Sequence, residues 1–240
     1  MRIQRIFITV FMLAALLVPV SVQAKSMQGS PRAVEGVTCQ LPESNAESLV
    51  ILSNYYPGYW WDHTDLTIAI QAHPSTTGEQ REALHDAIEV WSDVLLDCFD
   101  GLITLTDVTD TARNAQRADI VVHFVPHAGG AVFSGYAICG AHGCPNILVR
   151  SENPPAWGSA TYDPQLVEWI AMHEIGHALG LGHSTNLLES TDLMGYGWPD
   201  LGDPVLSDCD IDALAFVFAW ALEGSDPQPP AQGPYDCSLD

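Results

Sequence analysis

The run His-Glu-Ile-Gly-His-Ala-Leu-Gly-Leu-Gly-His, at residues 173–183, constrains the fold of this chain more than any other feature. On a helix, His173 and His177 lie one turn apart on the same face, so their imidazoles converge. If the helix continued, His183 would point roughly 240° away around the axis. Gly180 accepts the positive φ that ends a helix. The spacing therefore predicts a helix that stops at Gly180 and a chain that returns His183 to the other two histidines.

Three histidines in this arrangement suit a zinc ion. Imidazole nitrogens bind zinc at roughly 2.0–2.1 Å, and three protein ligands leave one position open for water. Glu174 directly follows the first histidine, where its carboxylate can take a proton from that water. We expect His173, His177 and His183 to bind one zinc ion and Glu174 to act as general base. Histidines that merely fill a core would not explain the glycine and the third histidine together.

The first 24 residues have the pattern of an export signal. Arg2 and Arg5 precede an almost wholly apolar run over residues 6–20, and Ala24 ends a segment suited to cleavage. The apolar run is shorter than the ~20 residues of a membrane span, and an uncleaved anchor is the alternative. We expect a secreted, extracellular protein without stable membrane association.

The composition is strongly acidic, with 30 Asp and Glu residues against 8 Lys and Arg. Such a surface argues against binding nucleic acid or anionic lipid, because both are negatively charged. It suits a protein in high salt or one that binds calcium, so Ca²⁺ is a second candidate cofactor. Plain solubility is the third interpretation. For the oligomeric state we expect a monomer.

Six cysteines in an exported chain predict disulfides, but the sequence does not choose among the pairings. Cys139 and Cys144 flank a turn-like segment, so a local bridge between them is the best single guess. The alternative is a second metal site made by these two residues with His142, and an oxidising compartment favours the bridge. The full set is Cys39, Cys98, Cys139, Cys144, Cys209 and Cys237.

Periodicity predicts the secondary structure. A helix with one apolar face is expected over residues 79–96, a second from Pro164 to Gly180, and a last one from Ser207 to Gly224. Strands are expected over residues 66–72, 103–106, 120–125, 132–138 and 146–149.

Both flanks of this region lack periodicity. We interpret residues 25–59 as an N-terminal extension or short pro-segment. The proline-rich tail at residues 225–240 is expected to be disordered unless a disulfide at Cys237 holds it.

The chain resembles the metzincin metallopeptidases, and most of all the matrixins, the family of the matrix metalloproteinases. The resemblance covers about residues 60–224 and rests first on the motif at 173–183 and on Ser184 after it. Leu193-Met194-Gly195 stands where the family has its Met-turn, the methionine lying beneath the metal. Residues 206–211 resemble the opening of the family's last helix.

The resemblance implies an α+β catalytic domain at residues 60–224. Its expected core is a twisted, mostly parallel five-stranded sheet with an antiparallel edge strand and two long helices packed on it. A C-terminal subdomain with a last helix follows. The resemblance also implies a secreted zinc endopeptidase that cuts polypeptides. The strand around Gly135 to Ile138 would pair with an extended substrate, and the loop from Gly195 to Val205 would wall the specificity pocket.

The sequence departs from the matrixin pattern upstream of the zinc motif. Pro31-Arg32 is followed by Ala33 instead of the family's zinc-blocking cysteine, so we expect no cysteine switch. The stretch between Phe124 and Ile147 is too short for the family's second zinc and calcium loops. We interpret the histidines nearby as ordinary polar or strand positions, and a second metal site formed by them is the alternative; they are His123, His127 and His142.

A further departure is Tyr196, two residues past Met194. It is more typical of the astacin and serralysin branches, whose tyrosine at this position can approach the zinc. Tyr196 is therefore a candidate catalytic residue that would hydrogen-bond the oxyanion, and packing against its loop is the alternative.

Two other functions stay open beside the endopeptidase. One is a zinc hydrolase that does not act on peptides, and the other is a catalytically silent zinc-binding module. Glu174 argues against the silent module, since replacement of that glutamate would be its sequence sign.

Overall fold

The structure is a computed structural model in which all described residues belong to the unit spanning Pro31–Asp240. The predicted export signal at residues 1–24 and Tyr196 both lie outside the described residues. The described residues are 39–44, 46–54, 59–111, 117–126, 134–140, 143–153, 160–185, 191–195, 204–231 and 233–237.

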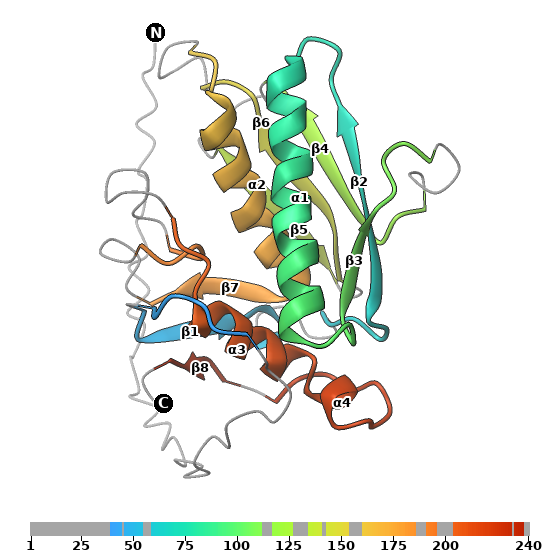
Figure 1. Ribbon diagram of the computed structural model, residues 1–240, viewed down its shortest axis with the longest axis vertical. Helices are drawn as coiled ribbons and strands as arrows, with labels where there is room; N and C mark the ends of the chain where they lie inside the picture. The colour runs from blue at the N-terminus through green and yellow to red at the C-terminus, as the bar shows by residue number, and fades with distance from the viewer. Residues whose placement is uncertain are drawn as a thin grey trace, which may run out of the picture. The chain divides into compact units, whose positions relative to one another are not determined.

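A five-stranded sheet with strand order β3-β2-β4-β6-β5 carries the fold (Figure 1). The strands are β2 (Asp65–Ala72), β3 (Thr104–Asp107), β4 (Ile120–Val125), β5 (Gly135–Gly140) and β6 (Gly143–Arg150). The pairs β2–β3, β2–β4 and β4–β6 are parallel, whereas β5 runs antiparallel to β6 at the edge. The α+β class and the mostly parallel sheet with an antiparallel edge strand are thus confirmed.

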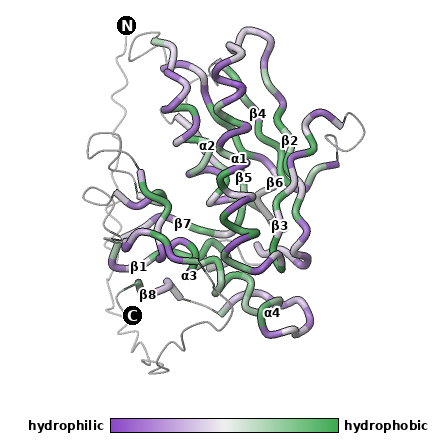
Figure 2. The backbone as a smooth tube through the Cα atoms, viewed as in Figure 1, coloured by the Kyte–Doolittle hydropathy of each residue, from purple (hydrophilic) through white to green (hydrophobic). Residues whose placement is uncertain are grey.

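Two long helices, α1 (Gly78–Cys98) and α2 (Pro164–Leu179), lie side by side on this sheet (Figure 1). α1 begins with a capping box in which Thr77 and Gln80 exchange side-chain and backbone hydrogen bonds. Its apolar face, which includes Leu84 and Trp91, is buried. Each such side chain stabilises the fold by roughly 1.5–3 kcal/mol when fully buried. In Figure 2 hydrophilic and hydrophobic positions alternate along α1, as expected for a helix with one buried face.

The second helix starts and stops where the sequence predicts. The side chain of Asp163 accepts a hydrogen bond from the backbone of Leu166, and Pro164 is the first helical residue. Gly180 ends the helix with φ of 121°, a value that favours glycine. The chain then turns into β7 (Leu181–Ser184) and carries His183 back toward the helix.

A second, three-stranded antiparallel sheet was not predicted. It has the order β7-β1-β8 and joins β1 (Ser48–Ile51) and β8 (Tyr235–Asp236) to β7. The short helix η1 (Leu52–Asn54) follows β1. Strands of two to four residues are too short to show a period-two pattern, which explains why sequence alone missed them.

The predicted last helix is interrupted. It forms as α3 (Asp208–Val217) and α4 (Ala219–Leu222), separated at Phe218, whose φ and ψ of −101° and 19° depart from helical values. Ser207 caps α3 as expected, through a capping box with Asp210. The prediction of one continuous helix from Ser207 to Gly224 is therefore corrected.

Disulfides fasten both ends of the described chain. Cys39 bonds to Cys98, and Cys209 bonds to Cys237, so the tail is held as the sequence analysis required. Cys139 is also disulfide-bonded and has no thiolate to offer a metal. The side chain of its predicted partner, Cys144, lies outside the described residues.

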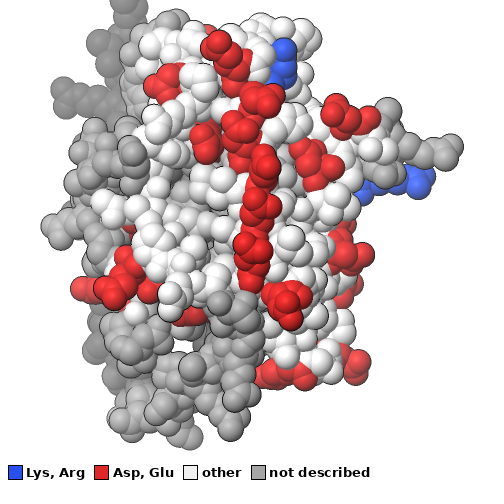
Figure 3. Space-filling model, in the orientation of Figure 1, with Lys and Arg blue, Asp and Glu red and all other residues white. Residues whose placement is uncertain are grey.

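No helix within the described ranges is long and apolar enough to cross a membrane. The longest, α1, carries a row of carboxylates along its exposed face, visible as a red column in Figure 3.

Candidate metal centre

The C-terminal half of α2 holds the candidate metal ligands in a buried setting. Every residue from Ile170 to Leu179 is buried, and His173 and His177 are 6% and 8% exposed. His183 on β7 completes the group, with its Nε2 3.2 Å from the Nε2 of His177. One ligand atom from each of the three residues lies within 4.8 Å of the others. The structure thus brings all three predicted histidines together.

Backbone carbonyls fix the orientation of two of these rings. Nδ1 of His173 lies 2.7 Å from the Leu193 carbonyl oxygen, and Nδ1 of His177 lies 2.7 Å from that of Leu181. A carbonyl only accepts hydrogen bonds, so each Nδ1 carries the proton and donates it. Each Nε2 is therefore the unprotonated nitrogen, which is the usual arrangement of a metal-binding histidine.

The buried setting also keeps the imidazoles neutral. Burial lowers the pKa of His177 to about 4 and that of His183 to about 3. Burial and the two neighbouring histidines lower the pKa of His173 well below its ordinary value. Neutral imidazole is the form that binds a metal, so the three residues fit zinc at neutral pH.

Glu174 lies beside the histidines in an unusual state. It is 5% exposed, and its Oε2 has no hydrogen-bond partner among the described residues. Burial raises its pKa to about 8. A buried carboxyl oxygen without a partner is costly for stability, which makes Glu174 a candidate for a chemical role. A group with this pKa can both take up and release a proton near neutral pH.

Strand β5 lies directly against Glu174. A Cβ added to Gly135 would sit 2.6 Å from Oε1 of Glu174 and 2.8 Å from Cγ2 of Ile170. Real Cβ contacts do not become this short, so only glycine lets β5 approach α2 so closely at this point. The edge of the five-stranded sheet and the candidate general base are therefore in contact.

The methionine turn packs against the other side of the same helix segment. Met194 is fully buried, and a Cβ on Gly176 would lie 2.5 Å from its Sδ. The Gly195 amide donates to the Asp192 carbonyl at 2.9 Å, which closes the turn, and the Ser184 amide donates to the Met194 carbonyl at 3.1 Å. Met194 thus packs against α2 at Gly176, the residue before His177.

Two aromatic residues that the sequence analysis did not single out hold the end of α2. The Tyr59 hydroxyl lies 2.7 Å from the His177 carbonyl and 2.6 Å from the Ala178 carbonyl, and Trp61 Nε1 donates to the Ala178 carbonyl at 2.9 Å. The last carbonyls of a helix have no partner within the helix, so these donors replace the missing ones. Contacts across more than 100 residues leave no local signal in the sequence.

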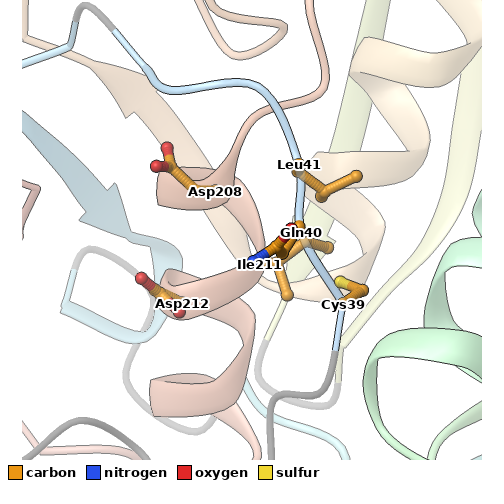
Figure 4. Close-up of a pocket in the computed structure, with 6 residues that line it drawn as sticks. All are labelled: Cys39, Gln40, Leu41, Asp208, Ile211 and Asp212. Carbon is orange, nitrogen blue, oxygen red and sulfur yellow. The ribbon is translucent and has the colours of Figure 1, made fainter.

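The histidine His123, considered for a second metal site, occupies an ordinary strand position. Its Nε2 lies 2.9 Å from the Asn146 side chain on the neighbouring strand. His127 and His142 lie outside the described residues. A separate pocket of about 370 Å³ lies between the N-terminal segment and α3 (Figure 4). It is lined by Cys39, Gln40, Leu41, Asp208, Ile211 and Asp212, and none of the three clustered histidines contributes to it.

Comparison with known proteins agrees with this geometry. Bovine interstitial collagenase is 27% identical over 185 residues, which cover 74% of this chain. Mouse stromelysin-3 is 30% identical over 181 residues, or 70% of this chain. The chain spans about a third of the length of these relatives, 36% of the collagenase and 34% of stromelysin-3. The family model for matrixins matches residues 59–214, which is more than half of the chain. The chain therefore belongs to the matrixin family.

Proposed function

We propose that this protein is a secreted zinc endopeptidase. His173, His177 and His183 bind the zinc ion, and Glu174 is the general base. The observation that carries the proposal is the convergence of three neutral histidines beside the buried Glu174, whose Oε2 has no hydrogen-bond partner among the described residues. Membership of the matrixin family supports the same activity.

The side chains of the site divide the work of peptide hydrolysis. Zinc, when bound, supplies a Lewis acid that polarises the peptide carbonyl and lowers the pKa of water. Glu174 accepts the proton of the attacking water and passes it to the leaving amine. Burial around Glu174 excludes bulk water and strengthens the interactions of its charge.

The free edge of β5 supports an extended polypeptide as substrate. β5 is the last strand of the five-stranded sheet, and among the described strands β6 is its one neighbour. Its Ile138 side chain is 48% exposed. An extended peptide can add to such an edge through backbone hydrogen bonds. Because Gly135 of this strand packs on Glu174, a peptide on the edge would lie close to the general base.

Five further assignments belong to the proposal. Residues 1–24 act as a signal peptide, and the disulfides suit the oxidising compartment that secretion implies. Residues 60–224 form the catalytic domain, preceded by an extension or short pro-segment. Tyr196 donates a hydrogen bond to the oxyanion, which a Tyr196→Phe variant tests through a kcat about 10- to 100-fold lower. Calcium remains a second candidate ion, and the protein acts as a monomer.

A digest of a mixed peptide library by the purified mature protein tests the activity. We expect cleavage within peptides, loss of cleavage after zinc is removed with a chelator, and recovery when zinc is added back. A parallel arm with calcium alone separates the two ions. Cleavage of small esters or amides but of no peptide would support the non-peptidase hydrolase. Zinc binding without any hydrolysis would support the silent binding module.

A further inference from the structure

Asp192, next to the methionine turn, is a buried side chain on which three hydrogen bonds converge. It is 1% exposed. Its Oδ1 accepts a hydrogen bond from the Met194 amide at 3.0 Å. Its Oδ2 accepts from the hydroxyl groups of Ser44 and Ser207, each at 2.7 Å. One carboxyl group thus connects the N-terminal segment, the methionine turn and the start of α3.

This carboxyl group acts on the metal site through the backbone. The residue between Asp192 and Met194 is Leu193, whose carbonyl oxygen accepts the Nδ1 proton of His173 at 2.7 Å. Asp192 holds the peptide on both sides of Leu193, since its own carbonyl accepts from the Gly195 amide and its side chain accepts from the Met194 amide. The position of the Leu193 carbonyl, and so the direction of the His173 ring, depends on these bonds.

A second buried carboxyl group, that of Asp210, lies beside the first. Asp210 is fully buried, and its Oδ2 accepts from the Ser207 amide at 2.9 Å. Burial, followed by the nearby Asp192 carboxyl group, raises the pKa of Asp210 well above its ordinary value. A protonated Asp210 avoids two like charges side by side. Burying two carboxyl groups costs the fold free energy. A contact that only joined chain segments would not need them, so the pair points to a further role.

We propose that Asp192 is a positioning residue for the metal site. Asp192 fixes the Leu193 carbonyl against His173 and links that carbonyl to the N-terminal segment at Ser44 and to the start of α3. The inference rests on the proposed three-histidine zinc site. It assigns no contact between Asp192 and substrate.

The test compares the zinc affinity of Asp192→Asn with that of the wild-type protein, measured by competition with a chromogenic chelator. We expect the affinity of the variant to be about 10-fold weaker, the low end of the usual effect of changing a group that orients a metal-binding histidine, because an amide NH2 cannot accept the hydrogen bonds of the Ser44 and Ser207 hydroxyls. Asp119→Asn is the matched control. Asp119 also accepts two hydrogen bonds, from the amide and hydroxyl of Thr67 beside β4, but neither joins the methionine turn. The control should bind zinc as the wild type does.

A spectroscopic measurement separates positioning from simple loss of stability. With cobalt in place of zinc, Asp192→Asn should shift the visible absorption bands of the metal, and Asp119→Asn should leave them unchanged even if both variants melt at a lower temperature. If Asp192→Asn does not fold, Ser44→Ala replaces it, because it removes one donor from Oδ2. Its expected effect on zinc affinity is smaller, about 2- to 5-fold.

These measurements use the metal alone, without peptide, and so separate two kinds of failure. A folded Asp192→Asn with wild-type zinc affinity and unchanged cobalt bands overturns the positioning role and leaves the proposed peptidase intact. Unchanged zinc affinity and unchanged cobalt bands in Ser44→Ala would likewise overturn the positioning role and leave the proposed peptidase intact. A wild-type protein that binds zinc but cuts no peptide removes the proposed activity and leaves the inference standing. A wild-type protein that binds no zinc overturns both.

Discussion

The two long helices pack on the same sheet but place their polar side chains in opposite environments. α1 exposes all its acidic residues, which recur every three or four positions and form the red column of Figure 3. They are Glu79, Glu82, Asp86, Glu89, Asp93 and Asp97. The C-terminal half of α2 exposes nothing, although it contains His173, Glu174 and His177.

The difference shows where polar groups cost the fold free energy. Exposed carboxylates on α1 repel one another by only a few tenths of a kcal/mol per pair, and salt screens them. Buried polar groups on α2 need partners, and the two helix histidines find them in the Leu193 and Leu181 carbonyls. Oε2 of Glu174 has no partner within the part of the chain that the structure describes. Substitutions should therefore matter far more on α2 than on α1.

The largest effect is expected at the metal-binding face of α2. His177→Ala removes one of three ligands, so the purified variant should lose its zinc and all measurable peptide cleavage. Elemental analysis per chain measures the first, and peptide digestion the second. His123→Ala, which changes a strand histidine paired with Asn146, should keep both. Undiminished zinc in His177→Ala would contradict the three-histidine assignment.

A smaller effect is expected from adding a methyl group to α2 at Gly176, where Met194 packs against the helix. Gly176→Ala places a Cβ 2.5 Å from the Met194 sulfur, and such overpacking lowers the free energy of unfolding by about 1–3 kcal/mol. Gly78→Ala on α1 is the control, because a Cβ there meets nothing within 4 Å. Chemical denaturation of both variants measures the difference. Equal stability of the two would mean that α2 tolerates side chains as α1 does.

The end of α2 should be less sensitive. Tyr59→Phe removes the hydroxyl that lies near the carbonyls of His177 and Ala178, while Trp61 still donates to Ala178. The Gly180 amide also still donates to the His177 carbonyl at 3.1 Å, so we expect a loss of about 0.5–1.5 kcal/mol in the free energy of unfolding, the usual net contribution of one hydrogen bond. A shift in the denaturation midpoint at constant slope would report it. No shift would show that Trp61 and the Gly180 amide are enough to pair these two carbonyls.

The smallest effect is expected on the exposed face of α1. Asp86→Asn and Glu89→Gln each remove one of several like charges, so stability should stay within about 0.5 kcal/mol of the wild type or rise slightly. Any gain should shrink as salt is added. Thermal melts at low and high ionic strength measure it. A loss above 1 kcal/mol in the free energy of unfolding of either variant would mean that these carboxylates make stabilising contacts with the rest of the fold.

The sequence predicted the helices and the main sheet because these elements are long enough to show a period. The 21 residues of α1 and the eight of β2 display it clearly. The end of α2 and the return of His183 were predicted from Gly180. Both follow from one local rule, that glycine adopts the positive φ that ends a helix. Family resemblance supplied the antiparallel edge strand, which periodicity alone does not orient.

The parts that were missed depend on contacts between distant segments. The Tyr59 hydroxyl meets a carbonyl 118 residues away, and Ser44 meets Asp192 across 148 residues. Neither Tyr59 nor Ser44 belongs to a motif. The β7-β1-β8 sheet forms from strands too short to be periodic, and pairing fixes them instead. Motif and spacing predicted the members of the candidate site, whereas its supporting hydrogen bonds required the structure.

The most direct test of the difference between the exposed carboxylates of α1 and the buried polar groups of α2 is Glu174→Gln. This substitution keeps the shape of the side chain but removes its proton-transfer chemistry. Zinc content and peptide cleavage are measured on the same folded sample. The account predicts about one zinc ion per chain, as in the wild type, with cleavage about 10²- to 10⁴-fold slower. Near-normal cleavage by a zinc-loaded Glu174→Gln protein would contradict it, because the buried carboxyl group of α2 would then have no catalytic role.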